Sequence, residues 1–262
     1  MGGLAYDHRG AGEPLVLLHG LGSRRQAWRP VVDLVAGQRE VWAVDLPGFG
    51  DSPPDSAGTA LRVADHADRV RGFFAQHGLE RPHLGANSLG AAIGLELART
   101  RTVRSLTAFS PVGFWGRPGQ AWCRWALRAG WEAGHRLPEP RSPRVALTLA
   151  RLGLLVPAFG RPFRAPAEEV LATRDAGLAA PGFLDALTYG LDYRFSGPRD
   201  LRGIPLTIAW GRRDLLLPSW TQSRRARRQL PWARHVSLPR CGHVPFYDDP
   251  GLCARVLLEG SA

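Results

Sequence analysis

The chain has 262 residues, 44% of them hydrophobic and 22% charged, which is enough apolar material for a large folded core and excludes a wholly disordered chain. No segment reaches the roughly 18 consecutive apolar residues of a membrane helix, and the N-terminus lacks the features of a secretory signal, so we expect a cytoplasmic protein without stable membrane insertion. The net charge is +11, but all 34 basic residues are arginine, which is typical of a GC-rich bacterial genome and does not predict nucleic-acid binding.

The first 110 residues alternate between strand and helix patterns. Short apolar runs predict four strands, at Pro14–Leu18, Glu40–Val44, Arg81–Asn87 and Val103–Phe109. Apolar residues at helical spacing predict a helix from Val63 to Phe74 and a second one from Ala91 to Ala98. Strands that alternate with helices predict an α/β fold, a mostly parallel twisted sheet of about seven or eight strands with helices on both faces.

The middle of the chain has a different composition. Residues 112–200 are rich in Pro, Arg and Trp, and their apolar stretches, such as Val145–Val156, favour short helices. The strand and helix rhythm then returns with Pro205–Trp210, Pro218–Leu230, Arg234–Leu238 and Asp249–Leu258. We therefore predict one core domain formed by residues 1–112 and 200–262, interrupted by a helical cap or lid at 113–199.

A possible nucleophile lies between a predicted strand and a predicted helix. The segment Ala86-Asn87-Ser88-Leu89-Gly90 has the small-x-Ser-x-Gly pattern of a nucleophile elbow, in which small residues permit a tight turn. The pentapeptide alone is also compatible with an ordinary Ser N-cap.

Two further polar residues each follow a predicted strand. Asp214 lies in Trp210–Asp214 and His243 lies in Cys241–Pro245. Because the carboxyl ends of parallel strands meet at one edge, Ser88, Asp214 and His243 are expected to converge in the order Ser–acid–His. His243 would take the Ser88 proton, and Asp214 would orient the imidazole.

The same chemistry requires an oxyanion hole. His19-Gly20-Leu21-Gly22 follows the first parallel strand, so the backbone N–H groups of Leu21 and Leu89 are the expected donors. His19 itself could act as a second base, but a hydrogen bond that stabilises the loop is the favoured role.

These motifs together resemble the α/β-hydrolase-fold serine hydrolases that carry a cap and act like esterases. The matching segments are Leu17–Gly22, Asp45–Ser52, Ala86–Gly90, Trp210–Asp214 and Gly242–Pro250. The resemblance implies an eight-stranded sheet with one antiparallel strand, a helical cap and no cofactor. Because the chain starts almost at the segment Leu4–Arg9, we expect the first edge strand of the family to be short or missing.

The preferred function is hydrolysis of an ester or related acyl substrate through an acyl-enzyme on Ser88. A carbon–carbon bond hydrolase, a lyase or an acyl-transfer or cyclisation enzyme on the same fold is the alternative, because fold does not determine chemistry. A binding protein that keeps the triad is a third possibility. Asn87 resembles hydrolases of meta-cleavage products, whereas Leu21 and Val244 depart from their pattern.

The expected partner is a small acyl substrate with an apolar or aromatic acyl group. Trp115, Trp122 and Val244 are the predicted substrate contacts. Cys123, Cys241 and Cys253 are too dispersed for a metal site or a disulfide set, so we predict reduced thiols and no metal. The dense run of Arg224, Arg225, Arg227 and Arg228 is interpreted as a solvated helix face, not a nucleic-acid site.

Overall fold

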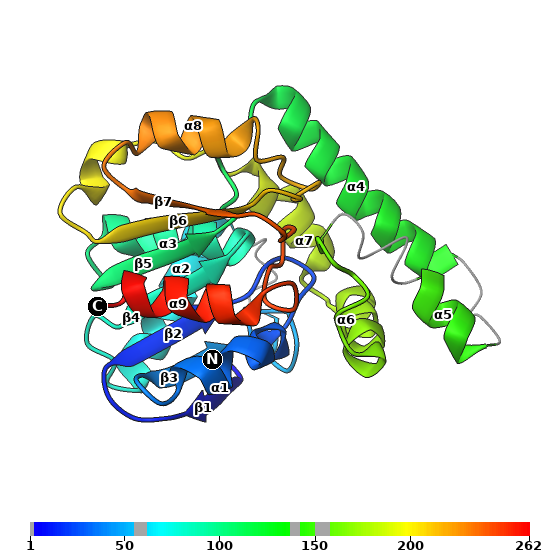
Figure 1. The fold of residues 1–262 in the computed structure, drawn as a ribbon, viewed down its shortest axis with the longest axis horizontal. Coiled ribbons are helices and arrows are strands. Elements are labelled where there is room, and N and C mark those ends of the chain that lie inside the picture. The colour runs from blue at the N-terminus through cyan, green and yellow to red at the C-terminus, as the bar shows by residue number, and fades with distance from the viewer. Residues whose placement is uncertain (1–2, 55–61, 137–141, 150–157) are drawn as a thin grey trace.

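A twisted sheet forms the centre of the molecule in the computed structural model, which describes residues 3–54, 62–136, 142–149 and 158–262 (Figure 1). Over these residues the sheet has seven strands in the order β1-β3-β2-β4-β5-β6-β7. Their bounds are β1 Tyr6–Arg9, β2 Pro14–Leu18, β3 Glu40–Val44, β4 His83–Asn87, β5 Ser105–Phe109, β6 Leu206–Gly211 and β7 Arg234–Leu238. All neighbours pair in parallel except β1 and β3, which are antiparallel. The predicted fold class is thus confirmed.

The number of strands differs from what the family resemblance implies. No strand precedes Tyr6 in the described residues, so the sheet has seven strands and not eight. All four β1 residues are exposed.

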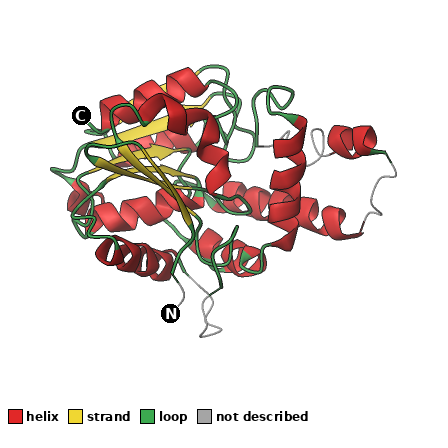
Figure 2. Ribbon diagram, turned by 90° about the horizontal axis from the view of Figure 1, so that it is seen from below, coloured by secondary structure: helices red, strands yellow, loops and turns green. Residues whose placement is uncertain are grey.

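Helices cover both faces of the sheet (Figure 2). The helices of the core are α1 Arg29–Val35, α2 Val63–Gln76, α3 Leu89–Arg99, α8 Gln222–Gln229 and α9 Pro250–Gly260. Strand β2 shows why both faces are covered, because its side chains alternate between them. Val16 and Leu18 pack into the apolar cluster that contains α2 and α3, whereas Leu15 and Leu17 pack into the cluster that contains α1 and α9.

The insertion between β5 and β6 is helical. It contains α4 Arg117–Arg136, α5 Pro143–Leu149, α6 Ala167–Ala179 and α7 Phe183–Thr188, and the described residues between 113 and 199 form no strand. Helix α5 covers the first part of the helical stretch predicted at Val145–Val156. The rest of that stretch lies outside the described residues. In Figure 1, α4, α5 and α6 extend away from one end of the sheet. No helix in the described residues is long and apolar enough to cross a membrane.

Candidate active site

Ser88 lies in the tight turn between β4 and α3. Its backbone has φ 55° and ψ −115°, a strained conformation for a residue with a side chain. Neighbouring glycines make this turn possible, because a Cβ on Gly90 would come 2.4 Å from the His19 carbonyl oxygen. A Cβ on Gly20 would likewise come 2.9 Å from the Ser88 Cβ. Close packing of the turn against the loop after β2 therefore requires glycine at both positions.

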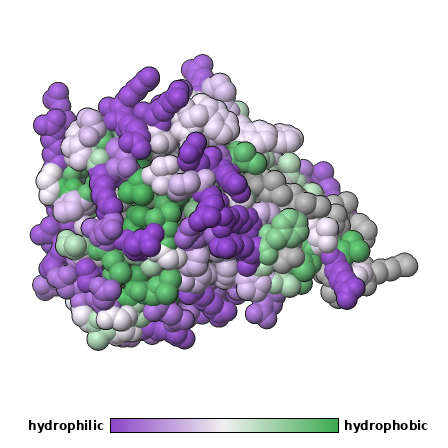
Figure 3. All heavy atoms as spheres, viewed as in Figure 1, coloured by the Kyte–Doolittle hydropathy of each residue, from purple (hydrophilic) through white to green (hydrophobic). Residues whose placement is uncertain are grey.

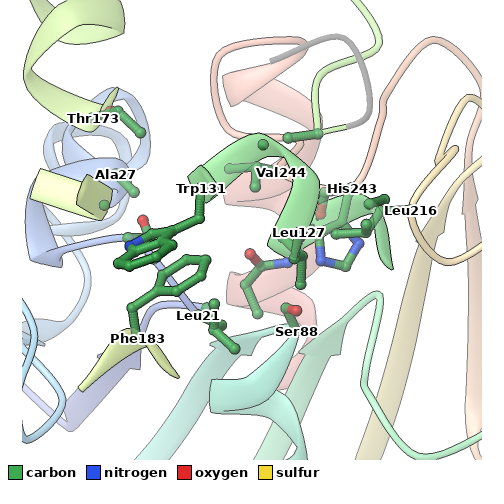
Figure 4. A pocket seen from close by; sticks show the side chains of 18 of the residues that line it. Leu21, Ala27, Ser88, Leu127, Trp131, Thr173, Phe183, Leu216, His243 and Val244 are labelled. Atoms are coloured by element: carbon green, nitrogen blue, oxygen red, sulfur yellow. Dashed lines mark hydrogen bonds between the residues drawn. The ribbon is translucent and has the colours of Figure 1, made fainter. Parts of the chain in front are cut away.

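Asp214 and His243 form a buried pair beside this turn. His243 Nδ1 lies 2.9 Å from Asp214 Oδ2, and the Leu217 N–H donates to Asp214 Oδ1 at 2.7 Å. Both carboxylate oxygens are thus occupied, and the Asp214 side chain is completely buried. A carboxylate at Nδ1 favours the tautomer protonated there, which leaves Nε2 as an acceptor. Ser88 and His243 line the same cavity (Figure 4). Since Asp214 is bonded to His243, the structure brings the three predicted residues together.

The side chain of Asn87 links the turn to the loop of His243. Its Nδ2 donates to the Phe109 carbonyl at 3.1 Å and to the His243 carbonyl at 3.0 Å. The second bond joins residues 156 positions apart and holds the backbone that carries His243. Sequence reasoning missed this positioning role, because an Asn before the Ser does not reveal its partners.

Asp248 is a second positioning residue that sequence reasoning missed. Its buried carboxylate accepts from the N–H groups of Gly242 and Gly160, each at 2.8 Å, and from that of Arg161 at 2.6 Å. Burial raises the pKa of Asp248, and the three N–H donors oppose that rise. Asp248 therefore joins the loop before His243 to the insertion, through contacts that its place in the motif Gly242–Pro250 does not specify.

His19 stabilises its loop, as favoured from the sequence. The Leu46 N–H donates to Nε2 at 3.0 Å, so Nδ1 carries the proton and donates to the Gly20 carbonyl at 2.8 Å. Burial lowers the pKa of His19 and keeps the ring neutral. Because both ring nitrogens are bonded to backbone, His19 has no free nitrogen for base catalysis.

Asp45 anchors the segment that supports this loop. Its carboxylate accepts from the Arg25 guanidinium, from the Arg25 N–H at 2.6 Å and from the Asp51 N–H at 2.9 Å. Gly50, with φ 54°, passes so close that a Cβ there would come 2.2 Å from Asp45 Oδ2. The motif Asp45–Ser52 is thus a structural support of the site.

The predicted oxyanion donors lie on two segments that meet at Ser88. Leu21 lines the cavity in the loop after β2. Leu89 is the first residue of α3, where backbone N–H groups have no partner within the helix. Both segments lie beside Ser88, as the predicted pair of donors requires.

The cavity beside Ser88 has a volume of about 160 Å³. Its far wall contains Trp131 of α4 and Phe183 of α7, whose rings stack with centroids 5.9 Å apart and planes 14° apart (Figure 4). Val244, one of the predicted substrate contacts, lines the cavity. Most of the lining is apolar, and the polar residues Ser23, Thr173, Arg174 and Tyr247 also contribute.

The prediction that Trp115 and Trp122 line the cavity is wrong. Trp115 is buried in the core, where its Nε1 donates to the Tyr193 carbonyl at 3.1 Å. Trp122 is 42% exposed, and its Nε1 donates to the Leu215 carbonyl at 2.9 Å. The helical period of α4 explains the error, because Cys123 faces the cavity and its neighbour Trp122 must face outward.

No group of three or more His, Cys, Asp or Glu side chains in the described residues could hold a metal ion. The three cysteines are buried and free.

The buried side chain of His66 on α2 makes the folding stability of the protein depend on pH. Burial lowers its pKa to about 4, and its Nδ1 has no hydrogen-bond partner in the described structure. Below the unfolded-state pKa, the unfolded chain binds a proton that the folded protein does not, so stability falls as the pH falls. Between pH 7 and pH 5 this should cost about 2 kcal/mol of unfolding free energy.

We expect His66→Gln to show a smaller loss of stability between pH 7 and pH 5 than the wild type in urea unfolding. The matched control is His135→Gln, which changes an exposed histidine of α4 and should leave the pH dependence unchanged. If the unfolding free energy of the wild type and of His66→Gln fell equally between pH 7 and pH 5, His66 would not be the source of the pH dependence.

The comparisons with known proteins agree with the fold and the motifs. The model of the "Alpha/beta hydrolase family" matches residues 15–256. A pimeloyl-[acyl-carrier protein] methyl ester esterase of Shewanella sp. (strain MR-7) is 29% identical over 93% of this chain and 88% of its own length. A dihydrolipoyllysine-residue acetyltransferase component of the acetoin cleaving system of Cupriavidus necator is 28% identical over 82% of this chain, but the match spans only 55% of that relative. Among solved structures, a thermophilic esterase from Thermogutta terrifontis superposes with a TM-score of 0.76, at 21% identity, over 98% of this chain and 92% of the other.

Proposed function

Because the chain belongs to the α/β hydrolase family, we propose that it hydrolyses carboxylic esters through an acyl-enzyme on Ser88. The observation that carries this proposal is the geometry of the site. A strained serine and a histidine line one cavity, and the histidine is held by a buried carboxylate 2.9 Å away. The similarity to a methyl ester esterase supports the same reaction class.

In the proposed mechanism, His243 acts first as a base and then as an acid in each half-reaction. The Ser88 oxygen attacks the ester carbonyl while His243 Nε2 takes its proton, and Asp214 stabilises the imidazolium. The N–H groups of Leu21 and Leu89 stabilise the oxyanion of the tetrahedral intermediate. The intermediate collapses, and His243 returns the proton to the departing alcohol. Water then attacks the acyl-enzyme by the same route, which releases the acid and regenerates Ser88.

The cavity supports a small substrate with an apolar or aromatic acyl group. A dry cavity of about 150 Å³ holds one benzene ring, and the volume here is about 160 Å³. The stacked rings of Trp131 and Phe183 give the cavity a flat apolar wall. Acyl groups of about the size of a benzoyl or short branched chain should therefore bind best.

A panel of p-nitrophenyl esters with graded acyl groups tests the reaction class. We expect turnover of acetyl to benzoyl esters, a sharp fall for long chains, and an added acyl mass on the intact protein in quenched samples. Absence of both turnover and acyl mass across the panel would contradict the proposed function.

A carbon–carbon bond hydrolase is the second candidate, because Asn87 before the nucleophile resembles hydrolases of meta-cleavage products. Here the Asn87 amide nitrogen is already bonded to two backbone carbonyls, which favours a structural role over a substrate contact. Bleaching of a yellow meta-cleavage product faster than ester hydrolysis would assign the chain to carbon–carbon chemistry.

We also propose that residues 113–199 act as a cap that controls substrate choice. The cavity is lined on one side by α4, α6 and α7 of this segment, and on the other by the Ser88 and His243 loops of the core. Because none of the proposed triad or oxyanion residues lies in the segment, its substitutions should act on binding.

Trp131→Ala and Phe183→Ala should change substrate preference without removing catalysis. Each substitution removes an apolar surface that a benzoyl group would contact, so kcat/KM for benzoyl relative to acetyl esters should fall about 5–30-fold. Trp125→Ala is the matched control, because Trp125 is an exposed residue of the same helix. Loss of acetyl ester turnover in a folded Trp131→Ala protein would show that the cap takes part in the chemistry.

A further inference from the structure

One face of the molecule combines exposed tryptophans with unpaired arginines. Its apolar members are Trp122 and Trp125 of α4, Leu215, and Trp220 just before α8, with exposed fractions of 42%, 63%, 44% and 56%. These are large side chains to leave in water. The arginines of this Trp–Arg face are Arg117, at the start of α4, and Arg224, Arg225 and Arg228 of α8.

Direct contacts make the face continuous. The rings of Trp122 and Trp125 lie 5.4 Å apart, and the Trp122 indole donates to the Leu215 carbonyl. The Arg225 guanidinium lies against the start of α4, where a Cβ on Gly116 would come 2.6 Å from its Nη1. The start of α4 therefore lies beside α8, and Figure 3 shows hydrophilic side chains projecting along the edge where Figure 1 places α8.

The positive charge of the face is not neutralised by the protein. None of its four arginines forms an ion pair with a described acidic side chain, and all four are exposed. Helix α8 contains no acidic residue. The only acid of α4 is Glu132, at the far end of the helix, where Arg128 and Arg136 pair with it. An anionic partner would thus meet an uncompensated cationic surface.

We propose that the Trp–Arg face binds the surface of an anionic lipid bilayer. Tryptophan rings partition into the boundary between headgroups and acyl chains, where the ring is apolar and its N–H is hydrated. Arginines beside them attract anionic headgroups. A nucleic-acid duplex would match the charge, but it would leave Leu215 and the indoles without an apolar acceptor. A bilayer accommodates both kinds of side chain.

The position of the face relates it to the cavity. The opposite side of α4 lines the cavity with Cys123, Leu127 and Trp131, and Leu216, next to Leu215, lines it as well. Docking of the outer side of α4 on a bilayer would bring an apolar cavity close to membrane-dissolved esters. This consequence rests on the proposed esterase function, but the docking itself does not.

Vesicle co-sedimentation tests the docking without any turnover, so its failure is distinct from failure of the proposed function. The wild type should bind vesicles of phosphatidylcholine mixed with phosphatidylglycerol, bind pure phosphatidylcholine far more weakly, and lose affinity with added salt. Arg224→Gln/Arg228→Gln should weaken binding to the anionic vesicles by about tenfold or more, because each arginine near such a surface contributes about fivefold. Trp125→Gln/Trp220→Gln should weaken binding to both kinds of vesicle.

Matched controls change the same residue types elsewhere. Arg71→Gln/Arg255→Gln, on α2 and α9, removes the same charge, and Leu34→Gln removes an exposed apolar side chain of α1. All variants should hydrolyse a water-soluble ester like the wild type. Equal loss of vesicle binding in the controls, or no binding to anionic vesicles by the wild type, would overturn the proposal. Binding of single-stranded or duplex DNA that is tighter than vesicle binding and persists at physiological salt would also overturn it.

Discussion

Ser88→Ala is expected to reduce kcat for any accepted ester by about 10⁴–10⁶-fold, because the covalent route is lost and only binding and the oxyanion hole would remain. The fold should persist, since the substitution removes one oxygen from a turn whose conformation is held by neighbouring backbone. Labelling by a fluorophosphonate, followed by intact mass, gives a direct measurement. The wild type should gain one adduct, and Ser88→Ala should gain none.

Ser110→Ala is a useful control for this experiment. Ser110 is also buried, follows a neighbouring strand and has a positive φ of 44°, but it does not line the cavity. Its substitution should leave the adduct on Ser88 unchanged. Equal adduct formation by the wild type and Ser88→Ala would mean that another residue is the nucleophile.

Asp214→Asn is expected to lower kcat by about 10⁴-fold with little change in KM. An amide at this position presents an N–H to the ring, so His243 would be held in the tautomer that is protonated at Nε2 and cannot accept the Ser88 proton. Because Asp214 also accepts the Leu217 N–H, an amide oxygen at Oδ1 keeps that bond. The substitution thus tests the electrostatic role with little loss of structure.

Pre-steady-state measurement of p-nitrophenol release would locate the defect of Asp214→Asn in the acylation step. Asp248→Asn serves as the comparison, because Asp248 is a buried carboxylate in the loop after His243 whose described hydrogen bonds all come from backbone N–H groups. It should lower stability more than kcat. A loss in kcat of less than about tenfold for Asp214→Asn, which is about 1.4 kcal/mol, would mean that another group orients His243.

Local patterns in the sequence determined the order of strands and helices. They also showed that the candidate site residues follow the carboxyl ends of strands. Alternation and helical spacing are short-range properties, so β2, β3 and β7 appear at the residues predicted, and α2 begins at Val63 as expected. The convergence of Ser88, Asp214 and His243 followed from one topological rule, because each comes just after a parallel strand and those carboxyl ends share an edge. That rule needs no knowledge of distances.

Only the tertiary structure decided which side chains face the cavity and what holds the loops of Ser88 and His243. Trp122 and Trp131 are both tryptophans of α4, but the rotation of the helix against the core turns one outward and the other inward. The bonds of Asn87 to His243 and of Asp248 to Gly160 join segments far apart in the chain. Such contacts depend on how helices and strands pack against one another. No short-range pattern in the sequence reports that packing. The motifs therefore specified where the chemistry lies, and the packing of the insertion determined the cavity wall that a substrate meets.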